Sequence, residues 1–117
     1  METCACCGFN TIGEKGNYEI CPICYWEDDG VQEADPWFEG GANVPSLYQA
    51  QLNFQTYGAM EERFISNVRK PSLNDTRNPD WRPINEEDKK YVTTPVKIEA
   101  VWGTKNSISY NYWERNA

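Results

Sequence analysis

The chain has 117 residues, a formal net charge of −7 and no histidine. This length suits one domain, 1–117, and the acidic balance argues against binding nucleic acid through its phosphates, which takes a basic face. The lack of histidine excludes Ser-His-Asp and Cys-His catalysis and zinc sites with imidazole ligands. We therefore expect a domain that is not an enzyme.

Residues 1–30 contain two cysteine pairs, Cys4-x2-Cys7 and Cys21-x2-Cys24. A C-x2-C turn places two sulfurs on one side of a tight loop, and two such turns close a tetrahedron around Zn²⁺ at Zn–S distances of roughly 2.3 Å. The spacing predicts a structural zinc ion with no coordination position left for water or substrate. A rubredoxin-like iron site uses similar pairs and stays open as an alternative.

The residues between the pairs, 11–20, have β character at Ile12, Tyr18 and Ile20 and glycines suited to a turn. They predict a hairpin, so that residues 1–30 form a small zinc ribbon with a C-x2-C turn at each end. The odd cysteine, Cys6, could replace Cys7 as a ligand or remain a free thiol beside the metal.

A helical part is expected over 46–70, after a turn-rich stretch at 31–45. Ser46 is a typical N-cap and forms a capping-box pattern with Gln49, while Gly58 is expected to end this helix. Its apolar stripe consists of Leu47, Ala50, Phe54 and Tyr57. A second short helix is predicted from Glu61 to Arg69, with Phe64, Ile65 and Val68 facing inward and Pro71 stopping it.

The remainder of the chain divides into a polar segment at 71–95, which carries four prolines, and an alternating apolar pattern at 96–114. We expect the first to be irregular and draped over the domain, and the second to be a β-hairpin. The predicted fold class is therefore α+β, with an N-terminal zinc ribbon, a central helix pair and a C-terminal β-hairpin.

Candidate partner contacts are one acidic run and several aromatic positions. The run Glu27-Asp28-Asp29 either caps a turn or helix start or forms part of an acidic binding face. Tryptophan is frequent at interfaces, although Trp26 is expected to pack over the metal turn instead. The other candidate contacts are Trp37, Trp81, Arg82, Trp102 and Trp113.

No stretch approaches the roughly 18 apolar residues that a membrane helix needs, so no membrane partner is expected. Five cysteines without a visible export signal predict a cytoplasmic protein, because paired cysteines in a reducing compartment more often bind metal than form disulfides.

The blocks Cys4–Cys7 and Cys21–Gly30 resemble the cysteine-rich CPCC family of small, mostly bacterial proteins. The likeness extends to about residue 70, and one departure from the family pattern is Ala5, which stands at the family's proline. The further matching blocks are Gly40–Asn43, Ser46–Leu47 and Glu61–Phe64. The resemblance implies zinc binding, and it associates the chain with proposed immunity proteins of bacterial toxin systems.

These observations predict a non-catalytic binding protein. Its most concrete form is an immunity protein that neutralises a basic partner toxin by covering the toxin with acidic surface. The alternative is a redox- or zinc-responsive protein that uses Cys6 as a thiol beside the metal.

Overall fold

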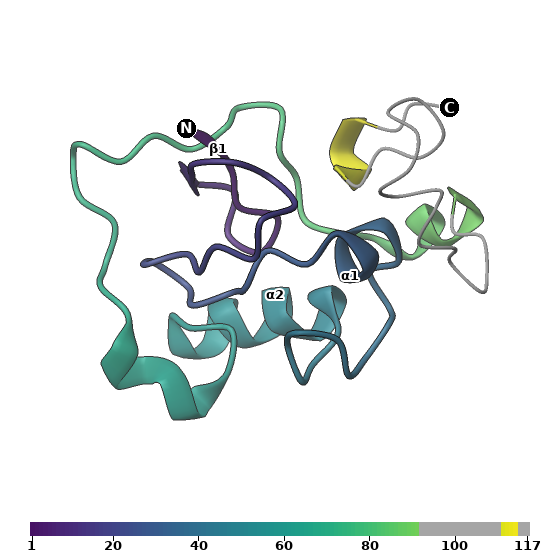
Figure 1. The fold of residues 1–117 in the computed structure, drawn as a ribbon, viewed down its shortest axis with the longest axis horizontal. Helices are drawn as coiled ribbons and strands as arrows, with labels where there is room; N and C mark the ends of the chain where they lie inside the picture. The colour runs from purple at the N-terminus through teal and green to yellow at the C-terminus, as the bar shows by residue number, and fades with distance from the viewer. Residues whose placement is uncertain (92–110, 115–117) are drawn as a thin grey trace.

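The computed structural model describes residues 1–91 and 111–114, and it has a small mixed architecture of short helices and a two-stranded sheet (Figure 1). This agrees with the predicted class at the level of a small mixed domain around a cysteine cluster. The elements are β1 (Glu2–Thr3), β2 (Asn10–Ile12), α1 (Gly30–Ala34), α2 (Leu47–Tyr57) and the 3₁₀ helices η1 (Glu62–Asn67), η2 (Glu86–Tyr91) and η4 (Tyr112–Glu114).

Backbone pairing flanks each C-x2-C turn. Strand β1 pairs antiparallel with β2 across the first turn, and Ile20 pairs with Glu27 across the second. The predicted hairpin within residues 11–20 is therefore wrong, because Ile12 pairs with Glu2 rather than with the residues that precede the second cysteine pair. Each turn closes its own pair of extended segments, which lets the two turns face each other.

Helix α1 is absent from the sequence prediction, which treated residues 31–45 as turn-rich. Asp29 begins this helix, and its carboxylate accepts hydrogen bonds from the backbone N–H groups of Val31 and Gln32. Such a side-chain cap satisfies donors that have no partner inside the helix. The capping interpretation of the acidic run thus applies to Asp29.

Helix α2 begins and ends where the sequence predicts. The Ser46 hydroxyl accepts a hydrogen bond from the N–H of Gln49 at 3.1 Å, and Gly58 ends the helix at φ 74°. The Gln49 side chain turns to Asn53 instead of completing the capping box. Within residues 1–91 and 111–114, no helix has the length and apolar character needed to cross a membrane.

The predicted apolar stripe of α2 is only partly correct. Leu47 and Ala50 are fully buried, whereas Tyr57 is 38% exposed. Gln51, a polar residue outside the stripe, is 4% exposed. Its amide donates to the carbonyl of Ala5 and to the hydroxyl of Tyr112, and its oxygen accepts from the N–H of Ile84. Gln51 therefore joins three distant segments of the chain.

The second predicted helix is a 3₁₀ helix, η1, and its inward face is smaller than expected. Phe64 packs on Tyr25 with ring centroids 4.6 Å apart, but Ile65 is 49% exposed. A 3₁₀ helix has three residues per turn, so side chains spaced for an α-helix do not share one face.

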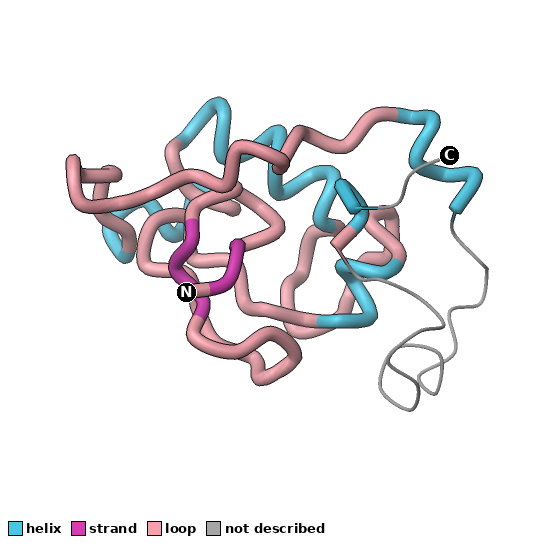
Figure 2. Tube along the Cα trace, turned by 90° about the horizontal axis from the view of Figure 1, so that it is seen from above, coloured by secondary structure: helices cyan, strands magenta, loops and turns pink. Residues whose placement is uncertain are grey.

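The irregular segment that follows η1 crosses the first cysteine turn, as the green trace in Figure 1 and the view from above in Figure 2 illustrate. The N–H of Asn10 donates to the carbonyl of Thr76, and Asn78 donates from its N–H to the carbonyl of Gly8. The guanidinium of Arg77 donates to the carbonyl of Cys7 at 2.9 Å. We call residues 76–81 the strap.

Most of the predicted C-terminal hairpin, including Trp102, lies outside the described residues. At its end, Tyr112 belongs to the 3₁₀ helix η4 rather than to a strand. The Tyr112 hydroxyl donates to the carbonyl of Arg82, and its ring meets that of Trp113 edge-on at 5.1 Å. Both rings are buried, so η4 completes the core beside α2.

Candidate metal centre

The first cysteine turn has the backbone geometry of a tight knuckle. The carbonyl of Cys4 accepts from the N–H of Gly8 at 2.8 Å, and the N–H of Cys4 donates to the carbonyl of Phe9 at 2.9 Å. Gly8 has φ 82°, a left-handed conformation that glycine adopts without steric cost. This turn holds Cys4 and Cys7 on one side of the loop.

The second knuckle repeats the same two hydrogen bonds. The carbonyl of Cys21 accepts from the N–H of Tyr25 at 2.8 Å, and its N–H donates to the carbonyl of Trp26 at 2.9 Å. Tyr25 has φ 73° where the first knuckle has glycine, a conformation that costs a bulky residue about 1–3 kcal/mol. The surrounding structure retains it because the turn aligns the two sulfurs.

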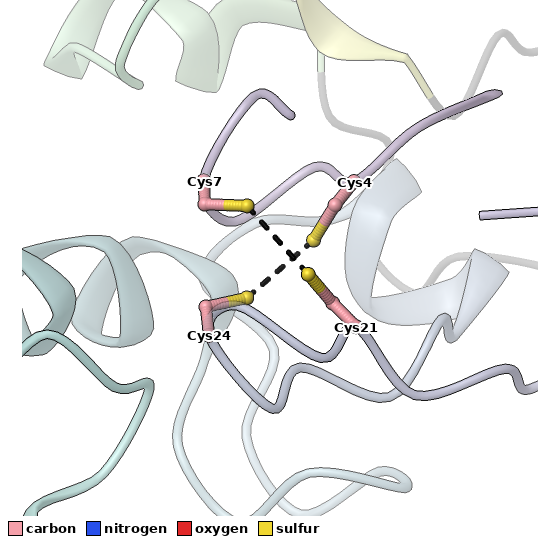
Figure 3. A group of neighbouring side chains, drawn as sticks. All are labelled: Cys4, Cys7, Cys21 and Cys24. Carbon is pink, nitrogen blue, oxygen red and sulfur yellow. Dashed lines mark hydrogen bonds between the residues drawn. The ribbon is translucent and has the colours of Figure 1, made fainter. Parts of the chain in front are cut away.

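The two knuckles bring four buried sulfur atoms together (Figure 3). The Sγ atoms of Cys4, Cys7, Cys21 and Cys24 all lie within 4.8 Å of one another. Cys4 faces Cys24 at 3.5 Å and Cys7 faces Cys21 at 3.7 Å, across the gap between the knuckles. A tetrahedron with metal–sulfur bonds of roughly 2.3 Å has edges of roughly 3.8 Å, so the sulfurs fit one metal ion.

The electrostatics of this group also favour a cation. All four residues are at most 1% exposed and none forms a disulfide. Burial raises the pKa of the Cys4 and Cys24 thiols, whereas hydrogen bonds from the neighbouring thiols, Cys24 first, lower the pKa of Cys21. Burial therefore opposes ionisation of the thiols, and a bound divalent cation is what allows all four to be thiolates.

Donors around the sulfurs orient the ligands. The N–H of Ile23 points to the sulfur of Cys21, and the N–H of Trp26 points to that of Cys24, each at 3.4 Å. The hydroxyl of Thr11 donates to Cys21 at 3.0 Å. Such contacts stabilise a metal-bound thiolate, and no signal in the sequence singled out Thr11 for this position.

Cys6 is not one of the four cysteines whose sulfurs converge. It is 1% exposed and packs in the core. The structure therefore brings together Cys7 rather than Cys6 with the other three cysteines.

The acidic run beside the second knuckle is largely internal. Asp28 is 1% exposed and Asp29 is 5% exposed, so neither can present an acidic face to a partner. The ammonium of Lys15 forms ion pairs with Asp28 at 3.1 Å and with Glu33 at 2.6 Å. The ring N–H of Trp26 donates to the other oxygen of Glu33 at 2.9 Å, which ties this ion-pair cluster to the knuckle.

Of the other predicted partner contacts, Trp37, Arg82 and Trp113 lie within the described residues and make contacts inside the protein. Trp37 is half-buried and stacks on Tyr48 with centroids 5.6 Å apart. Arg82 forms an ion pair with Asp88 at 2.6 Å. Trp113 is only 7% exposed, which removes it from a partner surface.

Trp81 covers the first knuckle. Its ring N–H donates to the carbonyl of Ala5 at 3.0 Å, and the guanidinium of Arg77 lies 4.8 Å from its ring centroid. An added Cβ at Gly8 would lie 2.6 Å from the indole, so the ring packs directly on this glycine. Through Trp81, the strap therefore packs against the first knuckle and covers it.

We expect Gly8→Ala to destabilise the protein by about 2–3 kcal/mol, because it combines left-handed backbone strain with a clash against Trp81. Gly40→Ala is the matched control: Gly40 has φ 79°, but no described heavy atom lies within 4 Å of an added Cβ. It should cost only roughly 1 kcal/mol. Chemical denaturation measures both, and equal losses would contradict the packing of Trp81 on Gly8.

Two equivalent knuckles that share one buried thiol cluster define a small protein with a four-cysteine site able to hold a metal ion. The chain belongs to the Cysteine-rich CPCC family, whose model matches residues 2–75. The resemblance drawn from the cysteine blocks is thereby confirmed. No curated protein matches the chain. The match ends at residue 75, just before the strap.

Proposed function

We propose that the metal is zinc and that it stabilises the fold rather than performing chemistry. The buried cluster of four cysteine sulfurs, all within 4.8 Å of one another, is the observation that supports this proposal. A site closed by four thiolates has no position for water or substrate, and the zinc ion supplies only a cross-link between the knuckles. Iron fits the same geometry, and elemental analysis of protein purified without added metal distinguishes the two.

We further propose that the protein is a cytoplasmic, non-catalytic immunity protein that neutralises a basic partner toxin by direct binding. Membership of the family and the net charge of −7 support this role. Since Asp28 and Asp29 are internal, the acidic surface rests on other residues. The exposed carboxylates of the described residues include Glu2, Glu14, Glu39, Glu62, Asp80, Glu86 and Glu87.

The test of this role is co-expression with the neighbouring open reading frames in a growth assay. Wild-type protein should restore growth to cells that express an adjacent toxin gene, and the Cys21→Ala variant should not. The proposal fails if no adjacent gene is toxic and the purified protein retains no basic polypeptide.

The alternative, a redox- or zinc-responsive protein, depends on Cys6. A sensing thiol is typically solvent-accessible, whereas Cys6 is 1% exposed. Its burial therefore favours the binding role. The folded protein should leave Cys6 unmodified by a thiol reagent, as intact mass spectrometry can measure. Modification of Cys6 in protein that retains its metal and fold would restore the sensor hypothesis.

A further inference from the structure

A small notch opens on the surface beside the second knuckle. It has a volume of about 60 Å³, far below the roughly 300–1,000 Å³ of small-molecule sites. A notch of this size accepts the end of one side chain. Its lining residues used below are Ile20, Glu27, Val44, Glu61 and Phe64.

The metal knuckle sets the position of two walls of this notch. Ile20 and Glu27 are paired across the Cys21–Cys24 turn, so their side chains lie next to each other at its base. The N–H of Met60, on the opposite wall, donates to the carbonyl of Cys24 at 2.7 Å. Both walls are therefore attached to the same metal-bound turn.

The third wall is a loop that buried amides hold in place. Asn43 accepts from the N–H of Glu27 at 2.9 Å and donates to its carbonyl at 2.8 Å, which fixes the neighbouring Val44 over the notch. The amide of Gln32 donates to the carbonyls of Phe38, Asn43 and Pro45. A site whose walls are fixed in the free protein loses little entropy on binding.

The surface of the notch combines apolar area with one uncompensated negative charge. Ile20 is 46% exposed and Val44 is 65% exposed. Arg63 also lines the notch, where its guanidinium lies 4.4 Å from the ring centroid of Phe64. It pairs with Glu61 at 2.8 Å, so these two charges cancel. The half-buried carboxylate of Glu27 has neither an ion pair nor a hydrogen bond within the part of the chain that the structure describes.

We propose that this notch binds one arginine side chain of the basic partner protein. Its apolar stem would lie against Ile20 and Val44, and its guanidinium would pair with Glu27. Arginine suits the site because its guanidinium is weakly hydrated, packs flat against apolar surface, and binds a carboxylate through two parallel hydrogen bonds. The inference rests on the proposed function in that the partner is basic.

The test titrates the ¹⁵N-labelled, zinc-loaded protein with N-acetyl-arginine methylamide and follows backbone amide shifts. The shifts should be confined to the notch and its loop, with saturation in the millimolar range. N-acetyl-citrulline methylamide, the neutral isostere, should leave them unchanged at the same concentrations. The charge pairing should also weaken as salt increases, because ions screen an exposed pair.

Two matched variants test the assignment of the carboxylate. Glu27→Gln should weaken binding of the arginine probe about five- to tenfold without changing the melting temperature, because this side chain has no described partner to lose. Glu86→Gln removes the same charge from an exposed position outside the notch and should bind like wild type.

The inference is overturned if the arginine probe moves no notch amide, if citrulline moves them equally, or if Glu27→Gln binds as tightly as wild type. These outcomes are independent of the growth assay. A protein that protects cells but ignores the arginine probe would retain the immunity role and lose this site. A protein that binds the probe but protects against no toxin would retain this site and lose the immunity role.

Discussion

A Cys21→Ala chain should be unfolded at room temperature and should carry no stoichiometric metal. Metal binding contributes about 10–16 kcal/mol to the folding of small zinc peptides, whereas the net stability of a domain is about 5–15 kcal/mol. Cys21 receives more contacts than the other ligands, from Cys7, Thr11 and the backbone of Ile23. Its removal therefore takes away a ligand and leaves three buried thiols without a common cation. Far-ultraviolet circular dichroism measures the loss of folded structure, and elemental analysis measures the metal content.

Cys6→Ala is the matched control, since it removes a buried thiol one residue from a ligand. It should keep one metal ion per chain and lose only roughly 1 kcal/mol, the cost of a small cavity. A folded, metal-loaded Cys21→Ala protein would contradict the ligand assignment. Loss of metal from Cys6→Ala would indicate that Cys6, rather than Cys7, is the ligand.

Lys15→Met should destabilise the protein by about 3–5 kcal/mol, because it leaves the carboxylates of Asp28 and Glu33 buried without a cation. The side chain of Lys15 is 6% exposed, and its ammonium contacts both carboxylates and also donates to the carbonyl of Thr3 at 3.1 Å. Thermal unfolding of metal-loaded protein measures the loss, which corresponds to a melting temperature lower by roughly 10–20 °C.

Lys70→Met is the control for the loss of one positive charge, because Lys70 is exposed and forms no ion pair among the described residues. Its melting temperature should lie within about 2 °C of wild type, as for most surface changes. Equal effects of the two substitutions would show that net charge, rather than the buried cluster, determines the loss.

The features that the sequence predicted correctly are those whose cause is local. The C-x2-C spacing forces two sulfurs together within each turn, and Ser46 and Gly58 act on the backbone within three residues of themselves. The segment predicted to be irregular, 71–95, is confirmed over residues 71–85, where prolines and polar residues disfavour regular structure, but it is wrong at Glu86–Tyr91, which form the 3₁₀ helix η2. Each of these signals needs no knowledge of which distant segments meet.

The features that were missed depend on contacts between distant segments. The burial of Gln51 makes sense only once Ala5, Ile84 and Tyr112 surround it. The acidic run could be interpreted as part of an acidic binding face because nothing in the sequence shows that Lys15 packs against it. The false hairpin at 11–20 arose because strand propensity does not reveal the partner strand.

We propose that one zinc ion joins the two knuckles and thereby stabilises the whole domain. The test is native mass spectrometry of protein expressed and purified without added metal. We expect one species whose mass exceeds that of the chain by a single zinc ion and whose narrow charge distribution reports a folded protein. After chelation, the zinc-free species should show the broad, high charge states of an unfolded chain. A compact protein without metal, or one whose mass shows disulfides in place of zinc, would contradict it.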